Sequence, residues 1–181
     1  MKKLVLTVLV TACLTGQIDA QIRYGLKAGL NFDKPKDAGM SVESATGWQA
    51  GAFAEVILPV VGIGVQPEVL YTVKKSKSNS SSSSISYFEV PINLRYELNL
   101  LVLRPYILAG PYFGYAVGFD GRYDKNNIEK TDFGVGFGAG VELFNKLQVG
   151  LRYSLGLKDV SVINAVEMKN RTFSLSAGIL F

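Results

Sequence analysis

The feature that most constrains the fold is an alternation of apolar residues with small or polar ones, which recurs eight times along the chain. Successive side chains of a β-strand point to opposite faces, so each stretch is predicted to be a strand with one apolar face. No charge interrupts these faces, and a period of two held this long excludes helices as the main element. The apolar faces run Ile22–Phe32, Trp48–Leu58, Val61–Tyr71, Phe88–Leu98, Leu103–Val117, Phe133–Leu143, Leu147–Leu157 and Phe173–Phe181.

The connections between these stretches alternate in length, which predicts an up-and-down meander. The short connections are Pro59-Val60, Asn99-Leu100 and Phe144–Lys146, and the long polar ones are Asp33–Gly47, Lys74–Ser84, Asp120–Lys130 and Lys158–Asn170. All tight turns then lie at one end and all long loops at the other, as in outer-membrane barrels with their short periplasmic turns and long external loops. The last strand is expected to pair with the first, because an unpaired apolar terminal strand would be an aggregation-prone edge.

A soluble barrel with its apolar face inside is the alternative, and the polar face argues against it. That face is rich in glycine, as in Gly134, Gly136, Gly138 and Gly140, where a surface facing water would carry Lys, Glu, Thr and Ser. Glycine suits a cramped interior in which long side chains need space. The prediction is therefore an all-β fold, an eight-stranded antiparallel up-and-down transmembrane β-barrel with a polar, glycine-rich interior.

Aromatic residues gather near both ends of the apolar faces. They are Phe32, Trp48, Tyr71, Phe88 and Phe133 at the loop end, and Tyr24, Tyr96 and Phe181 at the turn end. Two aromatic girdles around an apolar band mark the two interfaces of a membrane. This distribution supports the membrane barrel.

The first twenty residues have the pattern of a secretory signal peptide. Lys2-Lys3 precede an apolar core, Leu4–Leu14, and the small residue Ala20 stands at the expected cleavage point. Cleavage there divides the chain into a signal peptide, residues 1–20, and an outer-membrane barrel domain, residues 21–181. The predicted location is the cell outer membrane.

Cys13 offers an alternative, because Val10–Cys13 resembles a lipoprotein processing site. With cleavage after Ala20 instead, the remaining chain has no cysteine and therefore no disulfide or thiol chemistry. The formal charge falls from +4 to +3 once Lys2, Lys3 and Asp19 are removed. That charge is too small to indicate a nucleic-acid partner.

Several segments resemble the PorT-like outer-membrane β-barrel family, the porin-family barrels common in Bacteroidetes-type bacteria. The resembling segments are Tyr24–Asn31, Tyr87–Tyr96, Arg104–Tyr112, Phe133–Leu143, Leu147–Gly156 and the terminal strand. They span nearly the whole predicted mature chain in the family's order. The resemblance implies an eight-stranded membrane barrel, but little about activity, since the family is a scaffold with varied roles.

The chain contains no histidine, so a Ser-His-Asp arrangement and a histidine-based general base or zinc site are excluded. We assign no catalytic, cofactor-binding or metal-binding residue. The predicted inward face instead carries five acids and five bases, namely Glu55, Glu68, Glu89, Glu97 and Glu142 with Arg23, Lys27, Arg95, Arg104 and Arg152. Ions in a narrow lumen must be paired, and an eight-stranded barrel is just wide enough for side chains to fill. We interpret these charges as a structural plug; the alternative is a path for protons or small solutes.

The predicted function is a non-enzymatic integral outer-membrane protein, structural or an interaction scaffold. Its expected partners are outer-membrane lipid and lipopolysaccharide, the barrel-assembly machinery through the strand ending in Phe181, and a protein at the external loops. One alternative is a small porin or solute channel. A further alternative is a rim enzyme acting on outer-membrane lipid, for which the usual rim histidine is missing.

Turn lengths give predictions about strand register. Two-residue turns at Pro59-Val60 and Asn99-Leu100, with a three-residue turn at Phe144–Lys146, set each of four long charged side chains opposite a glycine. The predicted pairs are Glu55–Gly64, Glu68–Gly51, Glu89–Gly110 and Arg152–Gly138. The glycines would give the charged side chains space to bend across the lumen.

The same register places Arg95 directly opposite Arg104, a destabilising pair of like charges. Glu97 and Glu142 are therefore expected to bridge the two arginines. Four prolines, Pro67, Pro91, Pro105 and Pro111, lie within predicted strands, where a missing N–H removes a ladder bond. At least two of them are expected at β-bulges or strand ends.

Overall fold

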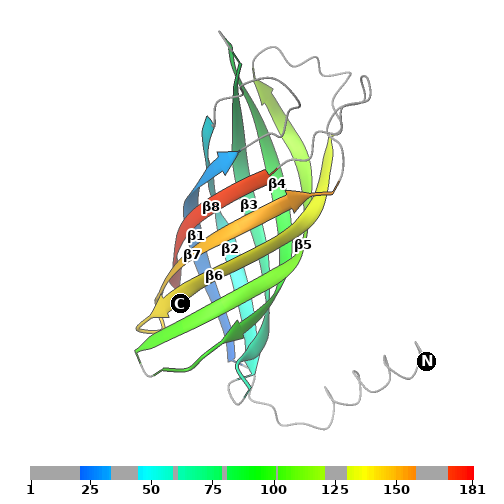
Figure 1. The fold of residues 1–181 in the computed structure, drawn as a ribbon. Coiled ribbons are helices and arrows are strands. Elements are labelled where there is room, and N and C mark those ends of the chain that lie inside the picture. Colours follow the sequence, from blue (N-terminus) through cyan, green and yellow to red (C-terminus); the bar gives the residue numbers. More distant parts are fainter. Residues whose placement is uncertain are drawn as a thin grey trace, which may run out of the picture.

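The computed structural model describes residues 21–33, 45–58, 61–78, 81–100, 102–120, 130–157 and 171–181. They form a closed barrel of tilted strands (Figure 1). The strands are β1 (Gln21–Asp33), β2 (Ala45–Leu58), β3 (Ile63–Ser78), β4 (Ser81–Glu97), β5 (Leu103–Asp120), β6 (Thr131–Leu143), β7 (Leu147–Gly156) and β8 (Arg171–Leu180). Each strand is antiparallel to its neighbours in the chain, and β8 pairs with β1 to close the ring. The predicted eight-stranded up-and-down barrel is confirmed.

Some predictions fall outside the described residues. They are the signal peptide of residues 1–20 with its alternative at Cys13, and most of the predicted loops around residues 34–44, 121–129 and 158–170. Across the described ranges, no helix is long and apolar enough to cross a membrane.

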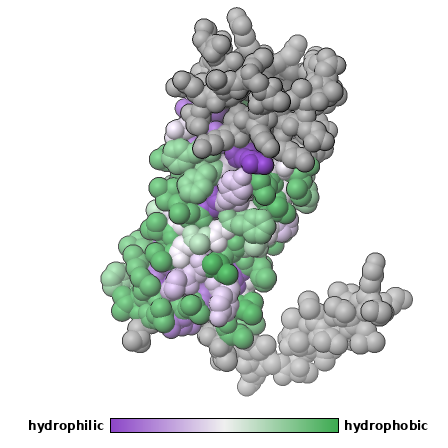
Figure 2. All heavy atoms as spheres, in the orientation of Figure 1, coloured by the Kyte–Doolittle hydropathy of each residue, from purple (hydrophilic) through white to green (hydrophobic). Residues whose placement is uncertain are grey.

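The side chains alternate between an apolar outer face and a polar lumen. Outward residues such as Ile22 and Leu94 are 60% and 61% exposed, whereas the inward Glu55, Arg95 and Glu142 are fully buried. Apolar residues cover most of the outer surface visible in Figure 2. A soluble barrel would have the opposite arrangement, because burial of apolar area drives folding in water. The prediction of an apolar exterior around a polar interior is confirmed.

Outward aromatic residues form a row across adjacent strands at the loop end. The ring of Tyr71 on β3 lies 5.6 Å from that of Trp48 on β2 and 5.5 Å from that of Phe88 on β4. Phe32 on β1 lies 6.4 Å from Phe173 on β8. Cross-strand aromatic pairs of this kind add to sheet stability beyond the ladder bonds. The row corresponds to the predicted girdle at this end.

The register across β2 and β3 differs from the prediction. Leu58 pairs with Ile63, so four residues rather than two connect the strands. The amide of Gly62 donates to the carbonyl of Leu58 at 2.8 Å, and Gly62 has φ of +70°, a conformation that favours glycine. The longer turn shifts the register of β3 against β2 by two residues. A shift by an even number leaves each side chain on the same face of the sheet.

The connection between β4 and β5 is also longer than predicted. β4 ends at Glu97 and β5 begins at Leu103, and within the connection the amide of Leu103 donates to the carbonyl of Leu100 at 2.7 Å. The predicted three-residue turn Phe144–Lys146 is confirmed, since Leu143 pairs with Leu147. The observed partners include Gly64–Ile57, Phe53–Glu68, Gly51–Leu70, Glu89–Gly114 and Arg152–Gly138.

The predicted long loop Lys74–Ser84 is wrong. β3 continues to Ser78 and β4 begins at Ser81, with Lys74 registered against Ile85. The segment is polar and rich in serine, as a loop would be, but its residues pair along the ladder from Lys74/Ile85 to Ser78/Ser81, and β-propensity depends strongly on such context.

The prediction that at least two of the four prolines lie at β-bulges or strand ends is also wrong. Only Pro105 lies close to a strand end. Pro67, Pro91 and Pro111 lie inside strands, and each falls at a short gap in the pairing with one neighbouring strand, after which the register resumes unchanged. The register shift between β4 and β5 lies instead at Ser86/Tyr87. A proline lacks only its own N–H, so the ladder can lapse locally without an inserted residue.

Candidate functional site: the charged lumen

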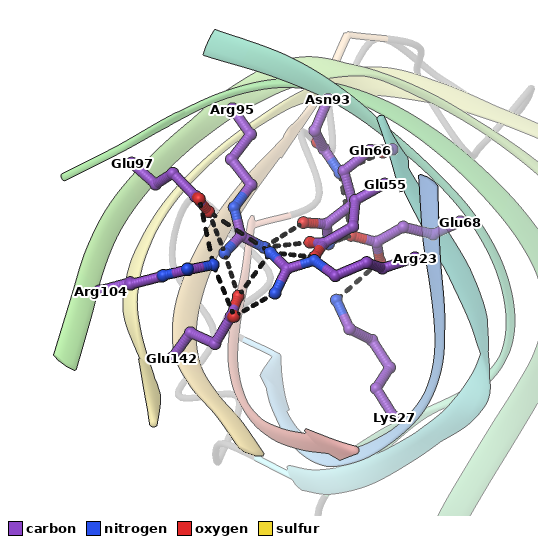
Figure 3. A network of polar contacts seen from close by, with 10 residues as sticks. All are labelled: Arg23, Lys27, Glu55, Gln66, Glu68, Asn93, Arg95, Glu97, Arg104 and Glu142. Carbon is purple, nitrogen blue, oxygen red and sulfur yellow. Dashed lines mark hydrogen bonds and ion pairs between the residues drawn. The ribbon is translucent and has the colours of Figure 1, made fainter. Parts of the chain in front are cut away.

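The charged side chains nearest the tight turns form one network, here called the turn-end cluster (Figure 3). Its members are Arg23, Glu55, Arg95, Glu97, Arg104 and Glu142, from β1, β2, β4, β5 and β6. All were predicted to face inward, and Figure 3 shows them converging from different sides of the barrel wall. Three guanidinium groups and three carboxylates therefore meet in one layer.

Arg95 lies at the centre of the turn-end cluster. Its Nη1 contacts Glu55 Oε2 at 2.6 Å, and its Nη2 contacts Glu142 Oε2 at 2.8 Å and Glu97 Oε2 at 3.0 Å. The guanidinium also lies 4.1 Å from the ring centre of Tyr106, a cation–π contact. Because the planar guanidinium offers donors in several directions, one fully buried arginine contacts carboxylates from three strands.

Arg23 and Arg104 complete the turn-end cluster from opposite sides. Arg23 contacts Glu55 at 2.6 Å and is hydrogen-bonded to Glu142. Arg104 Nη1 lies 3.7 Å from Glu142 and 3.9 Å from Glu97. Glu142 thus contacts all three arginines. Removing the charge of a buried carboxylate shared in this way would leave several arginines with too few negative partners at once.

The prediction that Glu97 and Glu142 bridge Arg95 and Arg104 is confirmed, although its premise is wrong. Arg95 opposes Leu108, and Arg104 opposes Glu142 directly. The longer connection between β4 and β5 separates the two arginines along the barrel axis. Long side chains still bring the predicted carboxylates to both.

A second network, the mid-lumen cluster, is built around Glu68 on β3. Its carboxylate contacts Lys27 Nζ at 2.9 Å and accepts hydrogen bonds from the amides of Gln66 at 2.8 Å and Asn93 at 3.0 Å. The carbonyl oxygen of the Gln66 side chain accepts from Arg95 at 2.9 Å. The two networks are therefore connected through one neutral amide.

Arg152 on β7 lies in the lumen on the loop-end side of Glu68. It opposes Gly138, as predicted, but the space for its guanidinium comes from Gly136: a Cβ there would lie 2.5 Å from Nη2. A Cβ on Gly138 would instead meet the backbone oxygen of Leu151 at 2.7 Å. The nearest carboxylate contact of Arg152 is Glu68 Oε1 at 3.9 Å. Arg152 is accordingly less tightly paired than Arg95.

The loop-end cluster consists of Lys74, Glu89, Asp132 and the rings around them. Lys74 Nζ lies 2.8 Å from Glu89 and 3.0 Å from Asp132, and 4.9 Å from the ring centre of Tyr87. The hydroxyl of Tyr112 donates to Asp132 at 3.4 Å. One ammonium thus links carboxylates from β4 and β6.

The inward face predicted from the sequence includes Glu89 but neither Lys74 nor Asp132. A signal for both existed. The alternation of β3 continues past Tyr71, with Thr72 and Lys74 inward, and Asp132 precedes the outward Phe133. Extending each alternating stretch by one or two residues would have found them.

A small polar cavity lies between the mid-lumen and loop-end clusters. Its lining includes Asn31, Thr72, Lys74, Glu89, Tyr112 and Arg152, and it has room for about one water molecule. Asn31 and Thr72 are buried, and neither the Asn31 amide atoms nor the Thr72 hydroxyl has a hydrogen-bond partner within the described residues. Such groups are ordinarily satisfied, so the cavity is a place for solvent rather than for apolar atoms.

The chemical capacity of the lumen follows from these contacts. In the described part of the chain, no group of three or more His, Cys, Asp or Glu residues could hold a metal ion. Each carboxylate of the turn-end cluster is paired with at least two arginines. The arrangement neutralises charge across the barrel and fills its cross-section.

Comparison with solved structures shows the same fold in proteins of low sequence identity. Neisserial surface protein A is 19% identical, with 89% of this chain and 97% of that chain covered and a TM-score of 0.60. The outer membrane enzyme PagL is 16% identical over 86% of this chain and 98% of that chain, with a TM-score of 0.62. At these identities the likeness concerns the fold alone.

Ail, the attachment invasion locus protein of Yersinia pestis, was solved with the heparin analogue sucrose octasulfate and is 15% identical, with 89% of this chain and 99% of that chain covered and a TM-score of 0.52. No curated protein matches the sequence. The model of one family, described as "Outer membrane protein beta-barrel domain", matches residues 4–181. That match covers all the described strands of the barrel. The chain therefore belongs to the outer membrane protein beta-barrel domain family.

Proposed function

We propose that the protein is a sealed, non-enzymatic barrel of the bacterial outer membrane that acts as a scaffold and meets its partners through the loop end. Family membership supports the location in the outer membrane. The main support for a sealed lumen is the turn-end cluster, in which Arg95, Glu55 and Glu142 are fully buried inside the barrel. A solute would have to break several of these contacts to pass. Separating one buried ion pair costs about 3–5 kcal/mol.

Conductance tests this proposal. In planar bilayers, the purified protein should give no stable nanosiemens-scale openings. The matched variant combines Arg95→Ser with Glu142→Ser, which removes one charge of each sign and shortens two central side chains. It should conduct, because the remaining Arg23 and Arg104 still have Glu55 and Glu97 as partners, so that the barrel can form with an open lumen. Stable openings in the unmodified protein would refute the sealed barrel.

The small porin is the main competing function, and the polar cavity beside Lys74 is the observation in its favour. The cavity has room for only about one water and is lined by Arg152, which lies 3.9 Å from Glu68, and this argues for a local hydrated site rather than a continuous path. A rim enzyme gains support only from the fold shared with PagL. The absence of histidine from the chain argues against the usual device of such enzymes.

The proposed orientation places the tight turns in the periplasm and the other end outside the cell. A single cysteine at Lys130, exposed at the loop end, should react with a membrane-impermeant reagent on intact cells, whereas one at Asn99 should not. Both variants need Cys13→Ser in the background. Equal labelling at the two positions would contradict this orientation.

Within the family, we assign the chain to the PorT-like barrels on the segments Tyr24–Asn31, Tyr87–Tyr96 and Arg104–Tyr112. The proposed partners are lipopolysaccharide, the barrel-assembly machinery acting on the strand that ends in Phe181, and a protein at the loop end. Crosslinking from Lys130 followed by identification of the captured protein addresses the last of these.

A further inference from the structure

The apolar outer surface does not stop where the strands end at the tight turns. Leu98, Leu100 and Val102, in the connection from β4 to β5, are 49%, 55% and 54% exposed, and Phe144 in the turn from β6 to β7 is 67% exposed. These four residues are here called the turn-end ledge. Apart from Asn99, Asn145 and Lys146, the described residues of these two connections are apolar. Connections that stand in water normally carry polar residues.

Backbone hydrogen bonds hold the ledge together as one surface. The amide of Phe144 donates to the carbonyl of Val102 at 3.0 Å, which ties the two connections to each other. The amide of Leu98 donates to the carbonyl of Pro105 at 2.9 Å. The exposed side chains are therefore presented by an ordered backbone that spans β4 to β7.

The turn that carries Phe144 is unusual for its sequence. Phe144 and Asn145 have φ of 55° and 56°, and the amide of Lys146 donates to the carbonyl of Leu143 at 3.0 Å, which defines a type I′ turn. Asn, Asp and Gly are the residues that favour both central positions of this turn. A phenylalanine held in the left-handed region with its ring outward is a strained choice for a purely structural turn. Strain of this kind points to a role for the exposed side chain.

The length of β7 indicates what covers the ledge. A transmembrane strand needs about 9–11 residues to cross the hydrocarbon core, and β7 has 10, from Leu147 to Gly156. β7 is thus about as long as a span needs, which places the inner edge of the hydrocarbon core near its first residue, Leu147. Phe144 precedes Leu147 by three residues, on the turn side of that edge, and it is exposed like the outward Leu147, Val149 and Leu151.

The opposite end of the barrel provides a contrast. Beyond the aromatic row at the loop end, the exposed described residues include Lys75 and Lys130, which suit water. Lys146 is the charged residue among the described residues of the ledge connections, and a lysine beside an exposed aromatic is a common interfacial pair, since its stem lies along apolar groups while the ammonium reaches phosphate.

We propose that the turn-end ledge is immersed in the headgroup region of the adjacent membrane leaflet and that its partner is phospholipid. The ledge anchors the β4–β7 side of the barrel and fixes how deeply that side sits. This inference goes beyond the scaffold role and does not depend on whether the lumen is sealed.

Depth-dependent fluorescence quenching tests the proposal in the full chain reconstituted into phosphatidylcholine vesicles. In a Trp48→Phe background, single tryptophans are introduced by Phe144→Trp, by Leu151→Trp as a control in the lipid core, and by Lys130→Trp as a control in water. Indole emission from Phe144→Trp should be blue-shifted relative to Lys130→Trp. It should be quenched by lipids brominated near the carbonyl and lose most of its quenching by aqueous iodide.

Two other occupants give distinct results that would overturn the proposal. Iodide quenching of Phe144→Trp as strong as that of Lys130→Trp would place the ledge in water, available to a soluble partner. Protection from both quenchers that disappears at a low protein-to-lipid ratio would indicate a second copy of the chain. Leu100→Trp, in the other connection, repeats the measurement without altering the strained turn. Heat-modifiability on gels verifies that each variant has folded.

Discussion

The two ends of the lumen solve the same problem of buried charge with different chemistry. At the turn end, three arginines and three glutamates from five strands contact one another, and each of these side chains has at least two partners of opposite charge. At the loop end, one lysine links Glu89 and Asp132, beside a cavity with room for about one water. A guanidinium is a rigid fork of donors, whereas an ammonium is a compact, strongly hydrated point charge. This difference is the basis on which we propose that the turn end is the drier part of the lumen and the loop end the more hydrated part.

The largest expected effect is at the turn end. Glu142→Gln removes the carboxylate that contacts Arg23, Arg95 and Arg104 and leaves buried positive charge without compensation. We expect destabilisation by about 3–5 kcal/mol, the cost of breaking a buried ion pair. Urea unfolding of the reconstituted barrel, followed by heat-modifiability on gels, measures it. An unchanged midpoint would mean that water already solvates the turn-end cluster.

The matched change at the loop end should be smaller. Glu89→Gln leaves Lys74 with Asp132 at 3.0 Å and with the ring of Tyr87, next to a polar cavity that can admit solvent. We expect a loss of about 1.5–3 kcal/mol, typical of one hydrogen bond to a charged group. The same unfolding assay compares the two variants. A loss equal to that of Glu142→Gln would remove the distinction between a dry end and a hydrated end.

The smallest effect is expected between the two clusters, at the glycine beside Arg152. The added Cβ of Gly136→Ala meets the tip of the Arg152 side chain, which can swing into the adjacent cavity, so the cost should be below about 1 kcal/mol. Gly138→Ala is the control, because its Cβ meets the Leu151 carbonyl on a fixed strand and should cost more, about 1–3 kcal/mol. The reverse order would show that Arg152 is held rigidly.

The predictable part of this molecule is the part that depends on local pattern. Which face each residue occupies follows from parity along a strand, so the lumen positions of Arg95, Glu55 and Glu142 could be predicted from the sequence. Register depends on turn length, so it was predicted correctly for β6 and β7 but not for β2 and β3 or for β4 and β5, where the connections are longer than expected. Pro59 to Gly62 forms a four-residue connection where two residues would have preserved the same faces.

The contacts between charged side chains could be predicted even where the pairing of the strands was predicted wrongly. Glu97 and Glu142 reach Arg95 and Arg104 although the strands are displaced from the predicted pairing, because glutamate and arginine side chains are long and flexible. The glycine that gives a long side chain its space was not predicted correctly. The space for Arg152 comes from Gly136 rather than from its direct partner, Gly138. Such close approaches depend on how a side chain bends in three dimensions, which the sequence pattern does not contain.

The pairing of β1 with β8 has a kinetic consequence. It joins the two ends of the described chain through pairs running from Gly25/Leu180 to Asp33/Thr172, and the amide of Phe181 donates to the carbonyl of Tyr24 at 2.9 Å. Contacts of such high sequence separation carry a large loop-closure entropy and slow folding. The ring therefore cannot close until the last strand has been delivered. Until then β1 and β7 are both open edges, and the unclosed barrel is exposed to misassembly through them.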